Sequence, residues 1–139
     1  MRTADVRKLI FTQTKGNTMS VIDLTAVNFK QVIEENAFVI VDFWAEWCEP
    51  CMNFLNVYTT VASQTPDIVF GKLNTDDFPD IAAYFDVKQV PCIFAIRDQV
   101  IIDGQIGEMT QKKFVEIIQM WRAFDNTDVN KHFDAKLSA

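Results

Sequence analysis

Two cysteines with two residues between them, Cys48-Glu49-Pro50-Cys51, stand where an apolar run gives way to a helix-favouring segment. Only a thiolate attacks a disulfide, so thiol–disulfide exchange requires an exposed cysteine that ionises near neutral pH and a second thiol that resolves the mixed disulfide. Unpaired N–H groups and the dipole at a helix N-terminus favour such an anion. We therefore expect Cys48 to be the nucleophile and Cys51, one turn into the helix, to be the resolving thiol.

A zinc site or a structural disulfide could also use this pair. A zinc site ordinarily needs a second pair of ligands, and only Cys92 and His132 remain to provide one. Trp47 before the pair and Pro50 inside it favour redox chemistry instead. A metal or iron–sulfur site built by all three cysteines, between two chains for example, stays as a rival hypothesis.

Residues 39–44 form a continuous β-favouring run, as expected of a central strand covered on both faces. Asp42 is the only charge in this run, and a carboxylate buried in a strand tends to keep its proton. Pro50 falls in the first turn of the following helix, where its missing N–H removes no hydrogen bond. The sequence therefore predicts a helix N-terminus at Cys48. Asp42, in the strand before that helix, is expected to be a buried carboxylate that either takes part in function or is only an unusual structural residue.

Predicted strands and helices alternate along the rest of the chain. The first is a strand at 21–24, followed by a helix that Thr25 caps and Asn36 ends. After the helix that carries the cysteine pair come a strand at 68–73, a short helix that starts at Pro79, a hairpin at 91–102 and a last helix that Thr110 caps. The faces expected to point inward comprise Cys51, Leu55, Tyr58 and Ala62 in the helix after the cysteine pair, and Phe114, Ile117, Ile118 and Trp121 in the last helix. This order predicts an α/β sandwich with a mixed central sheet whose antiparallel edge is the hairpin.

The segment 41–51 resembles the active-site region of the thioredoxin superfamily. The resemblance continues through Lys72, Val90-Pro91 and Ile106-Gly107 to the final helix and covers roughly residues 20–122. It implies a thioredoxin-like three-layer sandwich, with a mixed central sheet of about five strands flanked by about four helices.

The resemblance also implies roles for individual residues. Asp42 would be the buried general base that takes the proton of Cys51, through a water, and Lys72 would modulate the charge of Asp42. Pro91 would follow a cis bond, which would present the backbone of Val90 to an extended substrate strand.

The same resemblance implies a shallow apolar groove that accepts many protein substrates. Trp47, Ile106 and Gly107 would border it, and Glu49 and Pro50 would contribute to the surface that contacts the substrate.

Several residues depart from the usual family pattern. Glu49 stands where the family usually has Gly, and its negative charge should raise the pKa of Cys48 and shift the couple toward reductant, or select partners with basic surfaces. Met52 replaces a frequent Lys, which reinforces this effect. Asn56 replaces a kinking Pro, so the helix should run straighter.

Cys92 also departs from the family, which usually has Thr after the cis proline. Its position in a strand predicts a buried and inert thiol. The competing hypothesis is a third redox partner, because the fold would bring Pro91 against the dithiol and Cys92 near Cys51. In the hairpin turn, Gln99 stands where the family commonly has Gly.

The composition sets limits on the class of protein. At 139 residues and 49% hydrophobic residues, the chain fits one domain with a single core. A net charge of −6 argues against nucleic acid or an anionic membrane as partner, and no apolar run is long enough for a secretory signal or a membrane span. Three cysteines are too few for a disulfide-rich secreted framework, which favours a reducing compartment.

We expect three regions along the chain. Residues 1–19 are a basic, flexible extension, a weak organelle-targeting segment or sequence upstream of a start at Met19; residues 20–123 are the thioredoxin-like domain; residues 124–139 are a tail. Residues 125–130 look superficially like a calcium loop but lack its Gly and its distant Glu.

Together these observations predict a cytoplasmic, monomeric thiol–disulfide oxidoreductase that reduces protein disulfides and is recycled by a separate reductase, without a bound cofactor. Two alternatives remain open. A disulfide oxidase or isomerase would use the same residues at a different redox potential. A non-catalytic interaction module would use only the fold and its groove.

Overall fold

The computed structural model describes residues 20–124. The basic extension, the calcium-type segment and the tail beyond Phe124 lie outside the described residues.

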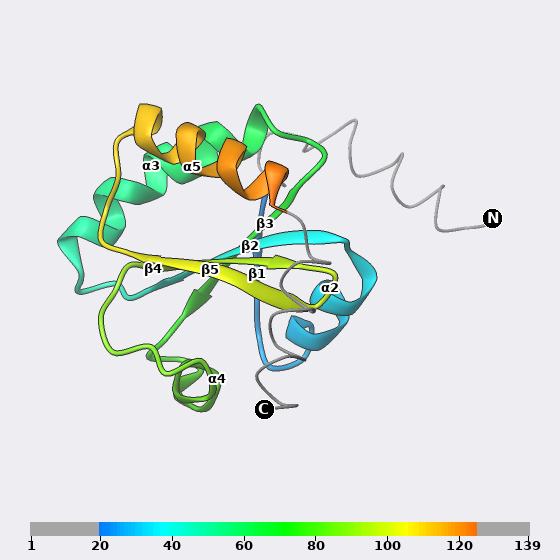
Figure 1. Ribbon diagram of the computed structural model, residues 1–139. Coiled ribbons are helices and arrows are strands. Elements are labelled where there is room, and N and C mark those ends of the chain that lie inside the picture. The colour runs from blue at the N-terminus through cyan, green and yellow to red at the C-terminus, as the bar shows by residue number, and fades with distance from the viewer. Residues whose placement is uncertain (1–19, 125–139) are drawn as a thin grey trace, which may run out of the picture.

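A mixed five-stranded sheet forms the centre of the domain (Figure 1). The strand order is β1-β3-β2-β4-β5; β1 and β2 both run parallel to β3, whereas β4 runs antiparallel to β2 and β5 antiparallel to β4. The strands span Val21–Asp23 (β1), Phe38–Trp44 (β2), Val69–Asn74 (β3), Cys92–Arg97 (β4) and Val100–Ile106 (β5). The hairpin therefore forms the antiparallel edge, as the sequence predicts.

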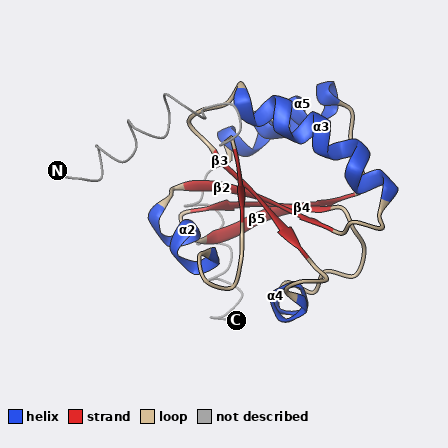
Figure 2. Cartoon of the chain, turned by 180° about the vertical axis from the view of Figure 1, so that it is seen from behind, coloured by secondary structure: helices blue, strands red, loops and turns tan. Residues whose placement is uncertain are grey.

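Helices cover both faces of the sheet, and the two views in Figures 1 and 2 show α3 and α5 on one face and α2 and α4 on the other. The helices span Phe29–Glu35 (α2), Glu49–Ser63 (α3), Pro79–Tyr84 (α4) and Gln111–Ala123 (α5). The predicted three-layer sandwich, with five strands and four helices between residues 20 and 124, is thus confirmed. None of the helices between residues 20 and 124 is long and apolar enough to cross a bilayer.

Side chains alternate between two hydrophobic cores along β2. Ile40 packs with α3 and α5, whereas Val39, Val41 and Phe43 belong to the core under α2 and α4. The strand is buried on both sides because alternate residues of a strand point to opposite faces.

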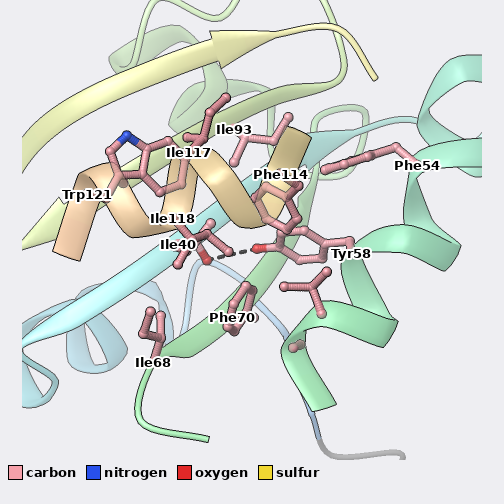
Figure 3. Packing of buried hydrophobic residues seen from close by; sticks show 13 residues of the cluster. Ile40, Phe54, Tyr58, Ile68, Phe70, Ile93, Phe114, Ile117, Ile118 and Trp121 are labelled. Carbon is pink, nitrogen blue, oxygen red and sulfur yellow. Dashed lines mark hydrogen bonds between the residues drawn. The ribbon is translucent and has the colours of Figure 1, made fainter. Parts of the chain in front are cut away.

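Tyr58 links α3 to the sheet at the centre of the first core (Figure 3). Its hydroxyl lies 2.9 Å from the Ile40 carbonyl oxygen and 2.6 Å from that of Gly71, so its single buried proton has an acceptor on β2 and another on β3. Its ring stacks on Phe114 of α5 at 5.7 Å between centroids. One side chain therefore joins both helices of this face to two strands.

The start of α2 differs from the prediction. Thr25 was expected to cap the helix, but the N-cap is Asn28. The Thr25 hydroxyl accepts from the backbone N–H groups of Val27 and Asn28 at 3.1 and 3.3 Å, and Asn28 Oδ1 accepts from the Thr25 N–H at 2.7 Å. These bonds close a separate turn before the helix, so the Thr25 prediction is wrong by three residues.

The inward face of α3 is wider than predicted. Cys51, Tyr58 and Ala62 are buried as expected, but Phe54 and Val61 are buried as well, and Leu55 is only partly buried. In α5 the Thr110 cap and all four predicted inward residues are confirmed.

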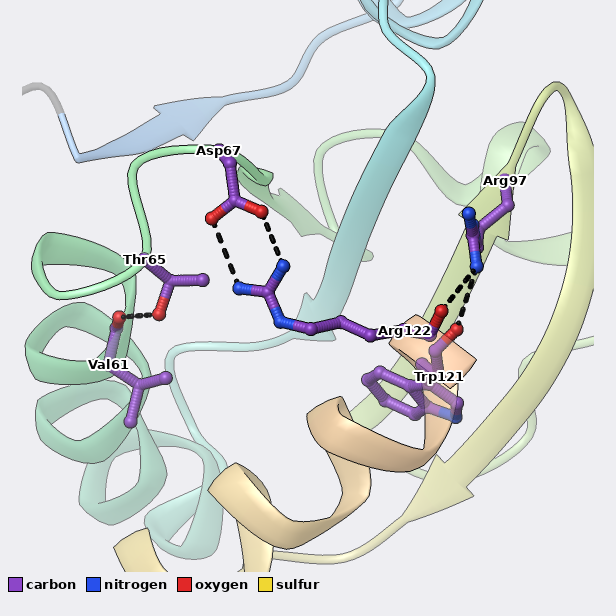
Figure 4. Close-up of polar contacts among 6 residues, drawn as sticks. All are labelled: Val61, Thr65, Asp67, Arg97, Trp121 and Arg122. Carbon is purple, nitrogen blue, oxygen red and sulfur yellow. Dashed lines mark hydrogen bonds and ion pairs between the residues drawn. The ribbon is translucent and has the colours of Figure 1, made fainter. Parts of the chain in front are cut away.

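The C-terminal end of α5 is held from two sides (Figure 4). Arg97 of β4 donates through Nη1 to the carbonyl oxygens of Trp121, Arg122 and Phe124 at 3.0, 3.0 and 2.9 Å. Arg122 forms a two-pronged ion pair with Asp67, and this pair lowers the pKa of the Asp67 carboxyl. These contacts fix the point at which the chain leaves the domain.

Candidate active site

The cysteine pair lies at the start of α3 and is joined by a disulfide, with the two Cα atoms 5.2 Å apart. Cys48 is the N-cap residue in an extended conformation, and its sulfur accepts a hydrogen bond from the Cys51 N–H at 3.1 Å. The same N–H would stabilise a thiolate on Cys48 once the disulfide is reduced. The local sequence thus places the sulfur where the helix best supports an anion.

The accessibility of Cys48 differs from the expectation. In this closed disulfide Cys48 is only 4% exposed, so the prediction of an exposed nucleophile is wrong for the oxidised state. Neighbouring Trp47 is 71% exposed and Glu49 and Pro50 also face solvent, so the surface around the sulfur is open although the sulfur itself is recessed.

The loop before β4 lies against the dithiol. The Val90–Pro91 peptide bond is cis, and the Val90 carbonyl oxygen is 3.6 Å from Cys48 Sγ. A disulfide sulfur carries no proton, so this contact becomes a hydrogen bond only when Cys48 is a thiol. Gly107, with a φ of +101°, donates from its N–H to the Pro91 carbonyl oxygen at 2.9 Å, which anchors the loop to the end of β5.

Exposed apolar side chains flank this loop and the cysteine pair. Ile106, 65% exposed, pairs in register with Cys92, the residue after the cis proline. Trp47, the neighbour of Cys48 in the chain, donates from its indole N–H to Asp76 Oδ2 at 3.0 Å. Sequence reasoning missed Asp76; the signal for it was its place just after β3, whose last residue pairs with the end of β2.

Asp42 lies buried in β2, 1% exposed. Neither carboxylate oxygen has a hydrogen-bond partner among residues 20–124. Burial raises the pKa of Asp42 well above its usual range, and the positive charge of Lys72 opposes this only in part. Asp42 therefore keeps its proton to a higher pH than an aspartate in water does.

Lys72 is in register with Asp42 on the neighbouring strand β3. Its ammonium, however, lies 3.3 Å from Asp23 Oδ1 and 4.8 Å from the centroid of the Trp44 ring. Lys72 thus acts on Asp42 as a nearby charge and not as a bonded partner.

A family model described as Thioredoxin matches residues 20–120. The chain belongs to the thioredoxin family. It is 38% identical over 112 residues to "Putative thioredoxin 2" of Streptomyces coelicolor, covering 81% of this chain and 84% of that protein. It is 34% identical to a thioredoxin of Pyropia yezoensis, covering 74% of this chain and 98% of that one.

Solved thioredoxin structures have the same fold. A mutant thioredoxin from Halobacterium salinarum aligns with a TM-score of 0.69 at 24% identity and covers 76% of this chain and 93% of that one. Plasmodium falciparum thioredoxin aligns with a TM-score of 0.68 at 24% identity and covers 72% and 98%. Family membership and the disulfide-bonded pair support thiol–disulfide oxidoreductase chemistry in general.

The structure places Cys92 away from the helix that carries the pair. It is a buried free thiol, in register with Phe43, in the core under α2 and α4. Burial, and secondarily the charge of Asp42, raise the pKa of Cys92 to about 11. These observations favour the hypothesis of an inert thiol over that of a third redox partner.

No group of three or more His, Cys, Asp and Glu side chains between residues 20 and 124 is arranged to hold a metal ion. The hypothesis of a metal site built by the three cysteines therefore has no support in the described part of this chain.

Proposed function

We propose that this thioredoxin reduces disulfides in other proteins through Cys48 and Cys51. The observation that carries the proposal is the position of the disulfide: the Cys48 sulfur caps α3, accepts the Cys51 N–H and faces the Val90 carbonyl beside the cis proline. A helix N-terminus favours thiolate at this sulfur, and the extended loop beside it offers a backbone against which a substrate strand can lie.

The proposed reaction proceeds in two exchanges. The Cys48 thiolate attacks one sulfur of the substrate disulfide, forming a Cys48–substrate disulfide while the other substrate sulfur leaves as a thiolate and takes a proton. Cys51, as a thiolate, then attacks Cys48, which releases the second substrate thiol and closes the Cys48–Cys51 disulfide. Two electrons pass from the dithiol to the substrate.

Asp42 is the proposed acceptor of the Cys51 proton in the second exchange. Its raised pKa and its lack of a hydrogen-bond partner among residues 20–124 support this role, because a base must hold its proton weakly enough to return it and strongly enough to take it near neutral pH. Lys72 would tune that balance from β3.

The proposed substrate surface surrounds the pair. It comprises Trp47, Glu49, Pro50, Val90, Pro91, Ile106 and Gly107. The exposure of Trp47, next to Cys48, and of Ile106, in register with Cys92, supports it, because exposed apolar side chains beside a backbone edge can accept many extended chains. We further propose a monomeric domain over residues 20–123 that works in the cytoplasm and is returned to the dithiol by a separate reductase.

An insulin-reduction assay tests the proposal. Cys48→Ser should abolish activity, and Cys51→Ser should accumulate a mixed disulfide with substrate, whereas Cys92→Ser is the matched control that should retain activity. An inactive wild type, or activity that survives in Cys48→Ser, would leave the interaction-module alternative.

The redox potential separates a reductase from an oxidase. Equilibration of the pair with a glutathione series should give a potential near the roughly −270 mV of thioredoxins, and a value near the roughly −120 mV of strong disulfide oxidants would contradict the reductase proposal.

A further inference from the structure

A second apolar feature lies on the opposite side of the sheet from α3 and α5. It is a groove of about 520 Å³ between α2 and α4. Its floor is formed by Ile96 and Ile101, which pair across the hairpin, and its walls include Ile33 of α2 and Ile81 of α4. Two of its lining residues are large and exposed: Tyr84 is 83% exposed and Ile101 45%. None of these residues serves the proposed redox site.

The rim of this groove is acidic, and a second hollow continues from it. Glu34 and Asp80 line the groove with Lys30 as the cation among its lining residues. The adjoining hollow, about 280 Å³, shares Glu34 and Gln99 with the groove and adds Glu35 and Asp98. The two together form a path with mostly negative side chains that leads to the hairpin turn.

The last described residue, Phe124, contacts the strand that leads into the hairpin turn. Its carbonyl oxygen accepts a hydrogen bond from Arg97 of β4 at 2.9 Å. Gln99, which lines both hollows, is two residues from Arg97, so their Cα atoms lie within about 7 Å of each other. The described chain therefore ends at the guanidinium of Arg97, two residues along the chain from the Gln99 that lines both hollows.

The sequence of the residues after Phe124 matches the groove in polarity and charge. Val129, Phe133 and Leu137 recur at every fourth position, a spacing that would put all three on one side of a helix. Lys131 and Lys136 outnumber Asp134 within residues 129–137, so this segment has a net charge of +1.

We propose that residues 129–137 of this chain occupy the groove between α2 and α4. The three apolar side chains would cover Ile81 and Ile101, and the two lysines would face the acidic rim. Apolar burial supplies the attraction, and the opposite charges set the orientation. This proposal does not depend on the redox function.

NMR spectroscopy of the full chain with labelled methyl groups tests it. We expect NOEs between the Phe133 ring and the methyl groups of Ile33, Ile81 and Ile101. Phe133→Asp should remove these NOEs and shift the three methyl resonances, because it places a negative charge against an acidic, apolar surface. Asn130→Asp is the matched control: it adds the same charge off the apolar spacing and should leave the NOEs in place.

Backbone hydrogen exchange gives a second measurement on the same proteins. Amides of α4 should exchange faster in Phe133→Asp than in wild type and in Asn130→Asp, since docking protects the helix beneath it. Equal exchange and equal methyl shifts in the two variants would overturn the proposal. So would NOEs from the groove to Leu9, Ile10 and Phe11 of the N-terminal segment, or methyl shifts that depend on protein concentration and so indicate a second copy.

Discussion

Glu49 occupies the first position of α3, directly after the sulfur that caps the helix. The Glu49 carboxylate and a Cys48 thiolate are both stabilised by the unpaired N–H groups at the start of α3, and the two negative charges repel each other. In thioredoxins that carry Gly here the thiolate has no such competitor. Glu49 thus bears on the redox potential of the Cys48–Cys51 pair.

We expect Glu49→Gln to lower the pKa of Cys48 and to make the potential of the pair less negative. The change should be on the order of 10 mV, because roughly 0.5 kcal/mol of interaction between surface charges corresponds to that shift for a two-electron couple. Thiolate absorbance and a glutathione series measure the two quantities. The control is Glu116→Gln on α5, which should change neither, and a higher Cys48 pKa in Glu49→Gln would contradict the argument.

For individual residues, the sequence predicted the position of the Cys48–Cys51 pair better than it predicted the contacts of the residues around the pair. Cys48 at a helix start follows from Pro50 and the preceding strand. The Trp47–Asp76 hydrogen bond and the ion pair of Lys72 with Asp23 join residues far apart in the chain, so they follow from the pairing of β3 with β2 and β1 and not from a local pattern. The recessed position of Cys48 likewise depends on the neighbouring loop.

The β4–β5 hairpin turns through two residues with positive φ, Asp98 at 52° and Gln99 at 69°. Arg97 and Val100 pair on either side, so the turn is a two-residue loop of the kind that favours glycine or asparagine. At positive φ the Cβ atom of Gln99 crowds the backbone, so this conformation has a higher energy for glutamine than for glycine.

Gln99→Gly should therefore stabilise the protein by about 1 kcal/mol, because glycine adopts positive φ without a steric penalty. Urea unfolding measures the free energy. Gln105→Gly in the extended strand β5 is the contrasting variant and should destabilise by roughly 0.5–1 kcal/mol. A lower stability in Gln99→Gly would contradict the strain argument.

The two arginines at the end of α5 provide another comparison between variants. Arg97→Gln should lower the free energy of unfolding by about 1.5–3 kcal/mol, since Arg97 is partly buried and bonds three carbonyl oxygens. Arg122→Gln breaks a solvent-exposed pair with Asp67 and should cost only about 0–1 kcal/mol. Urea unfolding of both variants tests the order, and an equal loss would contradict it.

The elements themselves were largely predictable. The alternation in β2, the Pro50 helix start and the Thr110 cap are local features, and all three appear where the sequence indicated. The failures arose where side chains compete with the helix for backbone groups, as at Thr25, or where tertiary contacts widen a buried face, as at Phe54 and Val61.

Across the whole molecule, Asp42 links stability to pH. Its pKa is raised in the folded chain above the ordinary value of 3.8, so over the interval between the two values the folded chain holds a proton that the unfolded chain has lost. Unfolding then releases a proton. The stability contribution is complete below the ordinary pKa and is lost as the pH rises through the folded one.

Asp42→Asn should remove this dependence. At mildly alkaline pH the variant should be more stable than wild type by on the order of 1–3 kcal/mol, because no unpartnered carboxylate remains buried. In acid, below the ordinary aspartate pKa, the difference should shrink. Urea unfolding across the pH range measures this difference in stability, with the exposed Asp77→Asn as the control. An Asp42→Asn variant that is less stable than wild type at alkaline pH would contradict the raised pKa of Asp42.

The same variant also tests the proposed role of Asp42 as proton acceptor. The mixed disulfide should resolve more slowly in Asp42→Asn.

The fold class was predictable from the order of elements, but the groove between α2 and α4 was not. It arises from Ile96 and Ile101 meeting across a hairpin and from two helices that leave a gap above them. No periodicity in any single segment carries that information.

Because Cys92 is a buried free thiol, its reaction with a labelling reagent can report unfolding of the domain. A reagent that alkylates thiolates at neutral pH should spare Cys92 in the reduced, folded chain, because Cys92 is enclosed by side chains and has a pKa of about 11. A label on Cys92 would then be added only when the sheet opens, so its rate of appearance would report global unfolding with no introduced probe.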